Sequence, residues 1–222
     1  MRNVGLTYKT AWYSAMRVRC AMIEHQHNLQ NIVEMDEAYV GGKPRKSNKR
    51  VPANKPSIST VINKRGRGTK KTPIVGVVER GGKIELKVIE KLTARNLLAL
   101  LTKTINEENT ILITDDNPTY KRFDDIVEHL TVKHKEQHTR GSVHTNTIDG
   151  FWAIVKNSIR GQYIAISKKY LPFYLVQAQY SYNSRNSKKN LFEELIKNAV
   201  KGDKCLVHYK PKKDVKDIVY KY

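Results

Sequence analysis

The chain has 222 residues, a length that suits one domain of ordinary size with a short appendage and argues against a second full domain. Hydrophobic residues make up 39% of it and charged residues 28%, which supplies a core and excludes disorder throughout. The 41 Lys and Arg against 21 Asp and Glu leave a net charge of +20, so a polyanionic partner is the first expectation.

The sequence contains no run of 18 apolar residues and does not open on the apolar segment of a signal peptide. We therefore expect no membrane partner and predict a cytoplasmic protein that associates with the nucleoid. Cys20 and Cys205 match no zinc or disulfide spacing, and both are expected to be reduced thiols.

Hydrophobic periodicity predicts the elements in chain order. The predicted strands span 31–40, 72–79, 83–89, 110–114 and 130–132, the second and third forming a hairpin across Gly81 and Gly82. The predicted helices span 7–25, 93–105, 120–128, 146–159, 167–183 and 191–200. Three strands followed by alternating helices and strands predict a mixed sheet with flanking helices. This is an α/β fold in the order of an RNase H-like domain.

The charge is uneven along the chain. Residues 43–71 contain 11 Lys and Arg and no acid, with Pro and Gly interspersed, which predicts a basic loop that binds DNA phosphates. The alternative is an ordinary solvated surface. The candidate DNA contacts in this loop are Lys43, Arg45, Lys46, Lys49, Arg50, Lys64, Arg65 and Arg67. The predicted organisation is an N-terminal helical segment (1–28), a central α/β domain (29–186), and a basic C-terminal helix and tail (187–222).

Three Asp residues stand where an unpaired carboxylate is costly. Asp36 lies within a predicted apolar strand, Asp115 ends another, and Asp149 lies in the first turn of a predicted helix. Carboxylates beside a core must be paired, hydrogen-bonded or bound to metal. Because Mg²⁺ prefers oxygen ligands, three converging acids suit two Mg²⁺ ions that promote in-line phosphoryl displacement, with Mn²⁺ as an alternative.

Each acid also has a structural interpretation. Asp36 could pair with an Arg, and Asp115 could begin the turn Asp-Asp-Asn-Pro. Asp149 could complete a capping box that Asn146 opens. Singly, these interpretations are at least as good as the catalytic one. Together they explain less, because the acids follow the order strand, strand end, helix, with 33 residues between Asp115 and Asp149.

The helix at 146–159 has a polar face that carries Asn146, Asp149 and Lys156, since residues seven apart nearly eclipse at 100° per residue. Lys156 lies two turns from Asp149, where a lysine can contact a phosphate as a point charge. The plain alternative is an exposed lysine on an amphipathic helix.

These motifs resemble the DDE insertion-sequence transposases with an ISXO-type catalytic domain, the branch related to the eukaryotic Merlin elements. The matching segments are 33–42 (VEMDEAYVGG), Thr114 and Asp115 with Tyr120, 144–152 (HTNTIDGFW) with Lys156, and 167–185. The resemblance covers about residues 5–185.

The resemblance implies a transposase that cuts and transfers the DNA of an insertion element. It implies Asp36 and Asp115 as the first two metal ligands and Asp149 as the third, at a position where the family usually has Glu. Asn146 is a candidate additional ligand. The implied partners are element-end and target DNA and, because paired ends are joined, a second copy in a homodimer. No small-molecule substrate is implied.

Lys156, His144 and Arg185 are further candidate DNA contacts. His144 could instead take part in capping the helix that follows, and Arg185 could belong to the core end of its helix. Relatives are expected to carry a zinc ribbon and a helix-turn-helix before the catalytic domain. Residues 1–28 are therefore interpreted as the remnant of a DNA-binding region, and the chain as N-terminally truncated.

Two other functions stay open. A non-catalytic DNA-binding remnant of a transposase predicts salt-sensitive DNA binding with no Mg²⁺ requirement. An RNase H-like nuclease predicts a preference for RNA or hybrid duplexes.

Overall fold

The computed structural model describes residues 5–41, 69, 71–132 and 143–200. The predicted DNA contacts from Lys43 to Arg67 lie outside these residues, as do Cys205 and the rest of the C-terminal tail. Cys20 is buried as a free thiol. Within the described residues, no helix is both long and apolar enough to cross a membrane.

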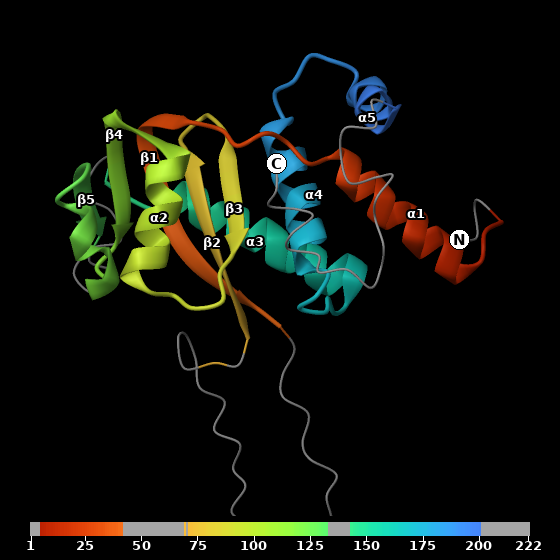
Figure 1. Ribbon diagram of the computed structural model, residues 1–222, viewed down its shortest axis with the longest axis horizontal. Helices are drawn as coiled ribbons and strands as arrows, with labels where there is room; N and C mark the ends of the chain where they lie inside the picture. The colour runs from red at the N-terminus through yellow and green to blue at the C-terminus, as the bar shows by residue number, and fades with distance from the viewer. Residues whose placement is uncertain (1–4, 42–68, 70, 133–142, 201–222) are drawn as a thin grey trace, which may run out of the picture.

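A five-stranded mixed sheet forms the centre of the fold (Figure 1). Its strands are β1 (Leu29–Val40), β2 (Thr72–Glu79), β3 (Ile84–Val88), β4 (Ile105–Asp115) and β5 (Glu128–Val132). The order is β3-β2-β1-β4-β5. β1 pairs antiparallel with β2 and parallel with β4, and β2 and β3 form the hairpin. β4 and β5 are parallel. This arrangement is that of an RNase H-like sheet, so the predicted fold class is confirmed.

The helices and single turns connect the strands and cover both faces of the sheet. They are α1 (Tyr8–Ala21), α2 (Ala94–Thr104), the 3-10 helix η2 (Pro118–Phe123), α3 (Asn146–Ser158), the π-helical turn η3 (Ile159–Tyr163), α4 (Leu171–Asn183) and α5 (Leu191–Val200). Figure 1 shows α2 in front of the strands and α3 behind them.

Side-chain alternation along the central strands creates two apolar clusters. Val33 and Met35 of β1 face the α2 side, together with Val75 and Val77 of β2. The residues of β1 that alternate with them, such as Ala38, pack with α3 and α4. The even-numbered side chains of β1, Asp36 among them, therefore face α3.

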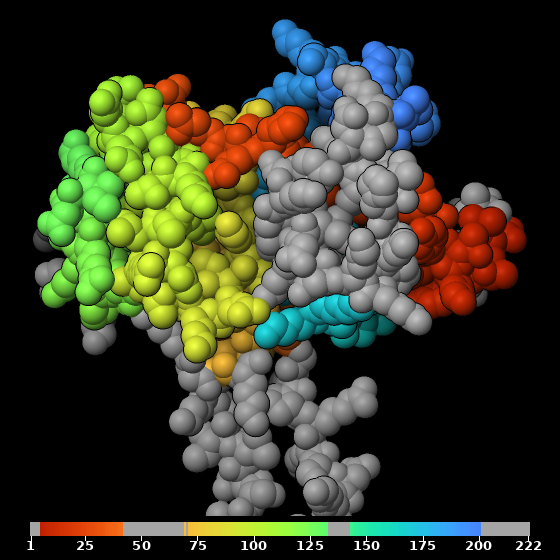
Figure 2. All heavy atoms as spheres, in the orientation of Figure 1, coloured from red at the N-terminus to blue at the C-terminus, as the bar shows by residue number. Residues whose placement is uncertain are grey.

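The outer edge of β3 is covered by α4. Gln179 Oε1 accepts a hydrogen bond from Leu86 N at 3.0 Å, and Asn183 Oδ1 accepts one from Ile84 N at 2.8 Å. These bonds occupy backbone donors that an open sheet edge would expose. Figure 2 shows α1 on the side of the molecule far from β5, and Arg19 of α1 donates from Nε to Gln177 Oε1 of α4 at 2.8 Å.

Several predicted bounds differ from the structure. The helix predicted at 120–128 is wrong: the segment forms the short 3-10 helix η2 and a turn, because Pro118 sits in its first turn and β5 already begins at Glu128. The long helix begins at Leu171 rather than at residue 167, with Pro172 in its first turn. The N-terminal helix ends at Ala21, four residues early, while Thr7 caps it by accepting from Thr10 N.

Candidate active site

A glycine brings α3 close to the sheet beside Asp36. Asp36 of β1 is the cross-strand partner of Gly76 in β2. A Cβ at Gly76 would lie 2.9 Å from both Ile148 Cδ1 and Trp152 Cζ2, closer than real Cβ contacts. Only glycine allows this approach, so the backbone of β2 and the side chains of α3 meet next to Asp36.

Asp36 lies in an environment that disfavours its charge. Burial raises the pKa of Asp36 from its ordinary 3.8 to about 7, and the charges of Glu37, Asp115 and Asp149 act in the same direction, while a backbone hydrogen bond from Glu37 opposes them. The side chains of the three candidate acids, which come from three separate segments, are therefore electrostatic neighbours.

Asp115 ends β4, the parallel neighbour of β1. Its Oδ1 accepts a hydrogen bond from Asn117 N at 3.3 Å, which is the turn predicted as its structural alternative. The same carboxylate thus begins a turn and raises the pKa of Asp36. Its two interpretations are compatible.

Asp149 lies exposed in the first turn of α3, and Asn146 is the exposed first residue of that helix. The capping box opened by Asn146 is wrong, because the N-cap is Thr145 and makes no side-chain capping bond to the backbone. Instead, Thr145 Oγ1 donates to Asp149 Oδ2 at 3.2 Å. The hydroxyl holds one oxygen of this exposed carboxylate.

The donor set fits a hard cation in chemistry, since all three acids supply oxygen and a nearby cation would offset the repulsion at Asp36. The distances between the acids do not meet the requirement of a metal site in the same way. Among residues 5–41, 69, 71–132 and 143–200, no three His, Cys, Asp or Glu side chains are close enough together to hold a metal ion. The acids are neighbours at Coulombic range and are not gathered at coordination distance.

Glu34, which the sequence analysis did not single out, holds the start of α3. It is fully buried on β1, on the same face as Asp36. Its Oε1 accepts from Arg80 Nε at 2.6 Å and from Thr147 Oγ1 at 2.9 Å. Its Oε2 accepts from Ile148 N at 2.9 Å. A carboxylate from the sheet therefore caps the helix that carries Asp149, where the helix dipole also favours negative charge.

His144 belongs to the same cluster. Arg80 Nη2 lies 3.0 Å from His144 Nδ1 and donates to the His144 carbonyl at 2.7 Å. His144 Nδ1 also lies 3.4 Å from Asn146 N. Because His144 Nδ1 accepts from Asn146 N at the start of α3, this placement favours the capping role over a direct DNA contact.

Glu37 faces the opposite side of β1 from Asp36, because side chains alternate along a strand. Its two oxygens accept hydrogen bonds from the Tyr120 hydroxyl and from Asn117 Nδ2. Burial and the charge of Glu37 raise the pKa of Tyr120, so this hydroxyl stays a donor. The contacts join β1 to the turn that follows Asp115.

The remaining described DNA candidates lie on helices. Lys156 is exposed on α3, as are Asn146 and Asp149, so the predicted polar face is present. Arg185 follows α4, where its guanidinium donates to the carbonyls of Tyr182 at 2.8 Å and Gly82 at 2.9 Å. Those bonds join the end of α4 to the β2–β3 turn.

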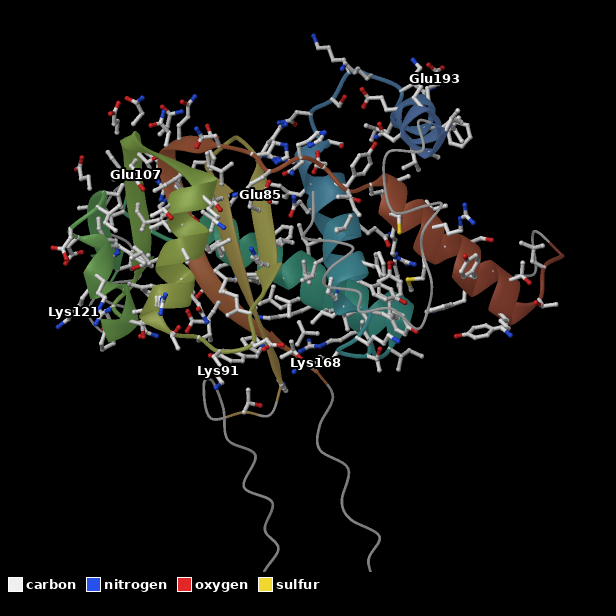
Figure 3. The ribbon with its side chains drawn as sticks, viewed as in Figure 1. Glu85, Lys91, Glu107, Lys121, Lys168 and Glu193 are labelled. Carbon is white, nitrogen blue, oxygen red and sulfur yellow. The ribbon has the colours of Figure 1, made fainter. Side chains whose placement is uncertain are left out.

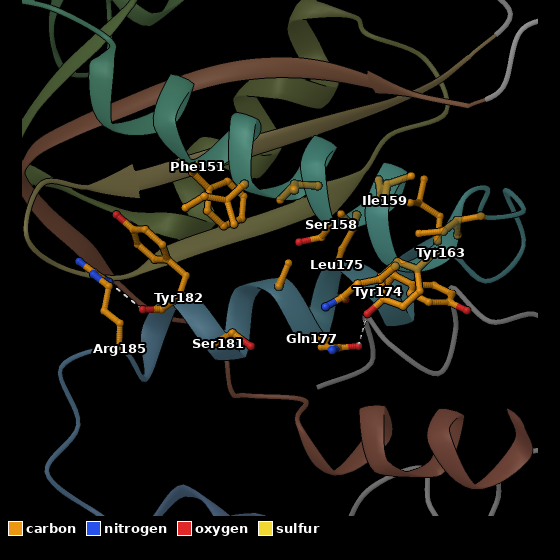
Figure 4. Close-up of a pocket in the computed structure, with 16 residues that line it drawn as sticks. Phe151, Ser158, Ile159, Tyr163, Tyr174, Leu175, Gln177, Ser181, Tyr182 and Arg185 are labelled. Atoms are coloured by element: carbon orange, nitrogen blue, oxygen red, sulfur yellow. Dashed lines mark hydrogen bonds between the residues drawn. The ribbon is translucent and has the colours of Figure 1, made fainter. Parts of the chain in front are cut away.

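An apolar groove of about 350 Å³ runs between α3 and α4, lined by aromatic side chains such as Phe151 and Tyr174 (Figure 4). Tyr163 donates to Gln177 Oε1 at 3.2 Å across its floor. No candidate acid lines this groove. It is therefore separate from the site around Asp36.

Sequence reasoning missed one supporting carboxylate, Glu34. Glu34 stands two residues before Asp36, so the period of two in a strand places it on the same face, and that signal was available. Nothing in the sequence indicates that Arg80, 46 positions away, is its partner.

The fold defines a class of protein, the α/β domains with an RNase H-like sheet, and the candidate acids lie on two of its inner strands and on α3. Residues 28–183 match the family model of the ISXO2-like transposase domain. The chain belongs to this family, and the family expected from the motifs is confirmed.

One curated relative is an uncharacterized protein in the transposable element ISH50 of Halobacterium salinarum. It is 25% identical over 181 residues, which are 78% of this chain and 59% of the relative. The chain therefore spans about three fifths of the relative's length.

Solved structures of Mos1 also match. The Mos1 mariner paired end complex with Mn is 16% identical and covers 91% of this chain and 63% of that chain, at a TM-score of 0.39. The Mos1 strand transfer complex is 17% identical and covers 88% of this chain and 62% of that chain, at a TM-score of 0.33.

Proposed function

We propose that this chain is a DNA transposase whose metal-dependent strand cleavage and transfer uses Asp36, Asp115 and Asp149. One observation carries the proposal: burial, followed by the charges of Glu37, Asp115 and Asp149, raises the pKa of Asp36 to about 7. A buried carboxylate with a raised pKa and acidic neighbours from other segments is a candidate functional site, because a chain that only needed stability would gain by losing the charge.

The carboxylates are the proposed holders of Mg²⁺, or of Mn²⁺, with Asn146 as an additional ligand. When bound, the ions would activate the attacking oxygen and stabilise the leaving oxygen of a phosphodiester displacement. Asp36 must lose its proton before it can ligate a cation, so its raised pKa makes binding stronger as pH rises through about 7. Glu34 and Glu37 hold the segments that carry Asp149 and Asp115.

The proposed substrate is DNA, at the element ends and at the target, in the cytoplasm and at the nucleoid. Lys156 and the basic segment at 43–71 are proposed to bind phosphates. If that segment neutralises about six of them, the logarithmic salt slope of binding is about −5 to −6. A homodimer is proposed because two ends must be joined. The catalytic unit is proposed to span 29–186.

A cleavage and joining assay with element-end DNA and Mg²⁺ tests the proposal. We expect Asp115→Asn to abolish both products, because the substitution removes one charged ligand while it preserves size. Asp116→Asn, at the exposed neighbouring position, is the matched control and should retain activity. Equal activity of Asp115→Asn and the unmodified chain would disprove the metal-ligand role.

A second candidate is a DNA-binding remnant without catalysis. It is favoured by the absence, in the described part of the chain, of three acids spaced to hold an ion. Calorimetric titration with Mg²⁺ separates the two functions. The remnant predicts no heat of metal binding and DNA affinity that is unchanged by EDTA.

A further inference from the structure

A basic pocket lies at one end of the sheet, beyond the acids. It has a volume of about 220 Å³ and lies between the end of β1, the start of β2 and the end of α3. Three cationic residues line it, Lys71, Lys156 and Arg160, and none of its described lining residues is acidic. Unbalanced positive charge in a hollow attracts a phosphate group.

The pocket stands at a definite distance from the acids. Lys156 is seven residues beyond Asp149 on α3, which is about 10 Å along a helix. Tyr39, also in the lining, is three residues beyond Asp36 on β1, which again is about 10 Å. The pocket therefore lies about 10 Å from the acids along both elements, within the span of one bound DNA strand.

A strained turn forms the rim of the pocket. Ile164 has φ 59° and ψ −51°, and Ala165 N donates to the Tyr163 carbonyl at 2.5 Å around it. This is the rare γ-turn with positive φ, which β-branched residues avoid because their side chain clashes with the backbone. Strain of this kind is kept where the conformation serves a function.

The side chain at the centre of that turn points into solvent. Ile164 is 87% exposed, the most exposed large hydrophobic residue of the described chain. It also lines the pocket beside the cations. A bare phosphate has no apolar surface to offer it, whereas a nucleotide brings a base next to its phosphate, and apolar wedges of this kind pack against bases in protein–DNA contacts.

We infer that this pocket is a nucleotide subsite for a DNA strand. Lys71 and Arg160, with Lys156, hold one backbone phosphate, and Ile164 packs against the adjoining base. The inference rests on the proposed action on DNA and adds a contact about 10 Å from the acids. It needs no metal, so it can be tested in EDTA.

The phosphate contact is tested by the salt dependence of binding. Fluorescence anisotropy with an end-labelled 30-base-pair duplex is measured in EDTA between 50 and 300 mM salt for Arg160→Gln and Lys71→Gln. Because these cations share one phosphate, each single substitution should reduce the size of the logarithmic salt slope by less than 1, and the Lys71→Gln/Arg160→Gln double variant should reduce it by up to about 1. Lys121→Gln is the matched control, since Lys121 is exposed in η2, lies beside β5 in Figure 3 and is not among the residues that line the pocket. Slopes equal to that of the control overturn the inference.

The base contact is tested at Ile164. Ile164→Gly relieves the positive φ, so the variant should unfold at the same temperature or higher. It should nevertheless bind the duplex about tenfold more weakly with an unchanged salt slope. Unchanged affinity would disprove the proposed contact between Ile164 and a base. Failure of Mg²⁺-dependent cleavage with these binding results intact would disprove the proposed catalysis alone.

Discussion

Glu34→Gln perturbs the structure at one buried point. Glu34 accepts hydrogen bonds on both oxygens, from Arg80 and Thr147 on one and from Ile148 N on the other. Gln has the same size but only one acceptor oxygen, so its amide N–H faces a donor in either orientation. The substitution also removes the charge that partners Arg80 in a fully buried position.

The magnitude follows from those contacts. An unsatisfied buried donor costs about 1–3 kcal/mol, and a lost charged partner adds to it. We expect the free energy of unfolding to fall by about 2–4 kcal/mol. The melting temperature of a chain of this size should then fall by about 5–12 °C. Thr147→Val removes a single bond to Glu34 and should cost about 1 kcal/mol.

Urea unfolding followed by circular dichroism measures the loss, and hydrogen exchange of the Ile148 amide locates it at the start of α3. Glu128→Gln, exposed on β5, is the isosteric control and should stay within about 0.5 kcal/mol of the unmodified chain. A Glu34→Gln variant as stable as this control, with an equally protected Ile148 amide, would refute the capping argument.

Three further substitutions test neighbouring parts of the site. Folding raises the pKa of Asp36 from its ordinary 3.8 to about 7, so the folded chain favours the protonated carboxyl. The stability that this preference contributes is complete below pH 4 and is lost as pH rises through 7. Asp36→Asn should therefore be more stable than the unmodified chain by up to about 4 kcal/mol above pH 7, and this difference should shrink toward zero near pH 4. Urea titrations at several pH values measure the difference. The control Asp116→Asn should show no pH-dependent difference. Gly76→Ala forces a Cβ against Trp152 and should lower stability by about 1–3 kcal/mol in the same assay; a neutral effect would contradict the close approach of α3. Tyr120→Phe removes a buried hydroxyl donor and should cost about 1–2 kcal/mol in thermal unfolding, while no loss would mean that the Glu37 contact is not formed.

The local sequence pattern correctly predicted much of the secondary structure. The hairpin of β2 and β3 follows from β-branched runs around Gly81 and Gly82, and the predicted bounds of β2 are those observed. The predicted bounds of α5 also hold. The periodicity and turn residues of these segments lie within the segments themselves, so their secondary structure does not depend on contacts with distant parts of the chain.

The prediction of a helix at 120–128 failed because local helical tendency competed with the packing of the sheet. The segment after Asp115 has helical composition, yet it forms a 3-10 helix because Tyr120 and Phe123 are buried in the α2-side core and β5 must pair with β4 directly afterward. The apolar residues were recognised correctly. Their packing, which shortens the helix, depends on strands far away in sequence.

The order of residues alone determined the basic character of the chain, the alternation that turns Asp36 toward one face of β1, and the succession of elements with an acid on each of three. These depend on composition and on periods of two and 3.6 residues, which are local. Only the tertiary structure decided that Glu34 caps α3, that Gly76 admits Trp152, and how near the acids stand. Those contacts join segments that lie far apart in sequence and are brought together by packing of the core. The residues between two such segments do not determine how close the segments lie in the fold.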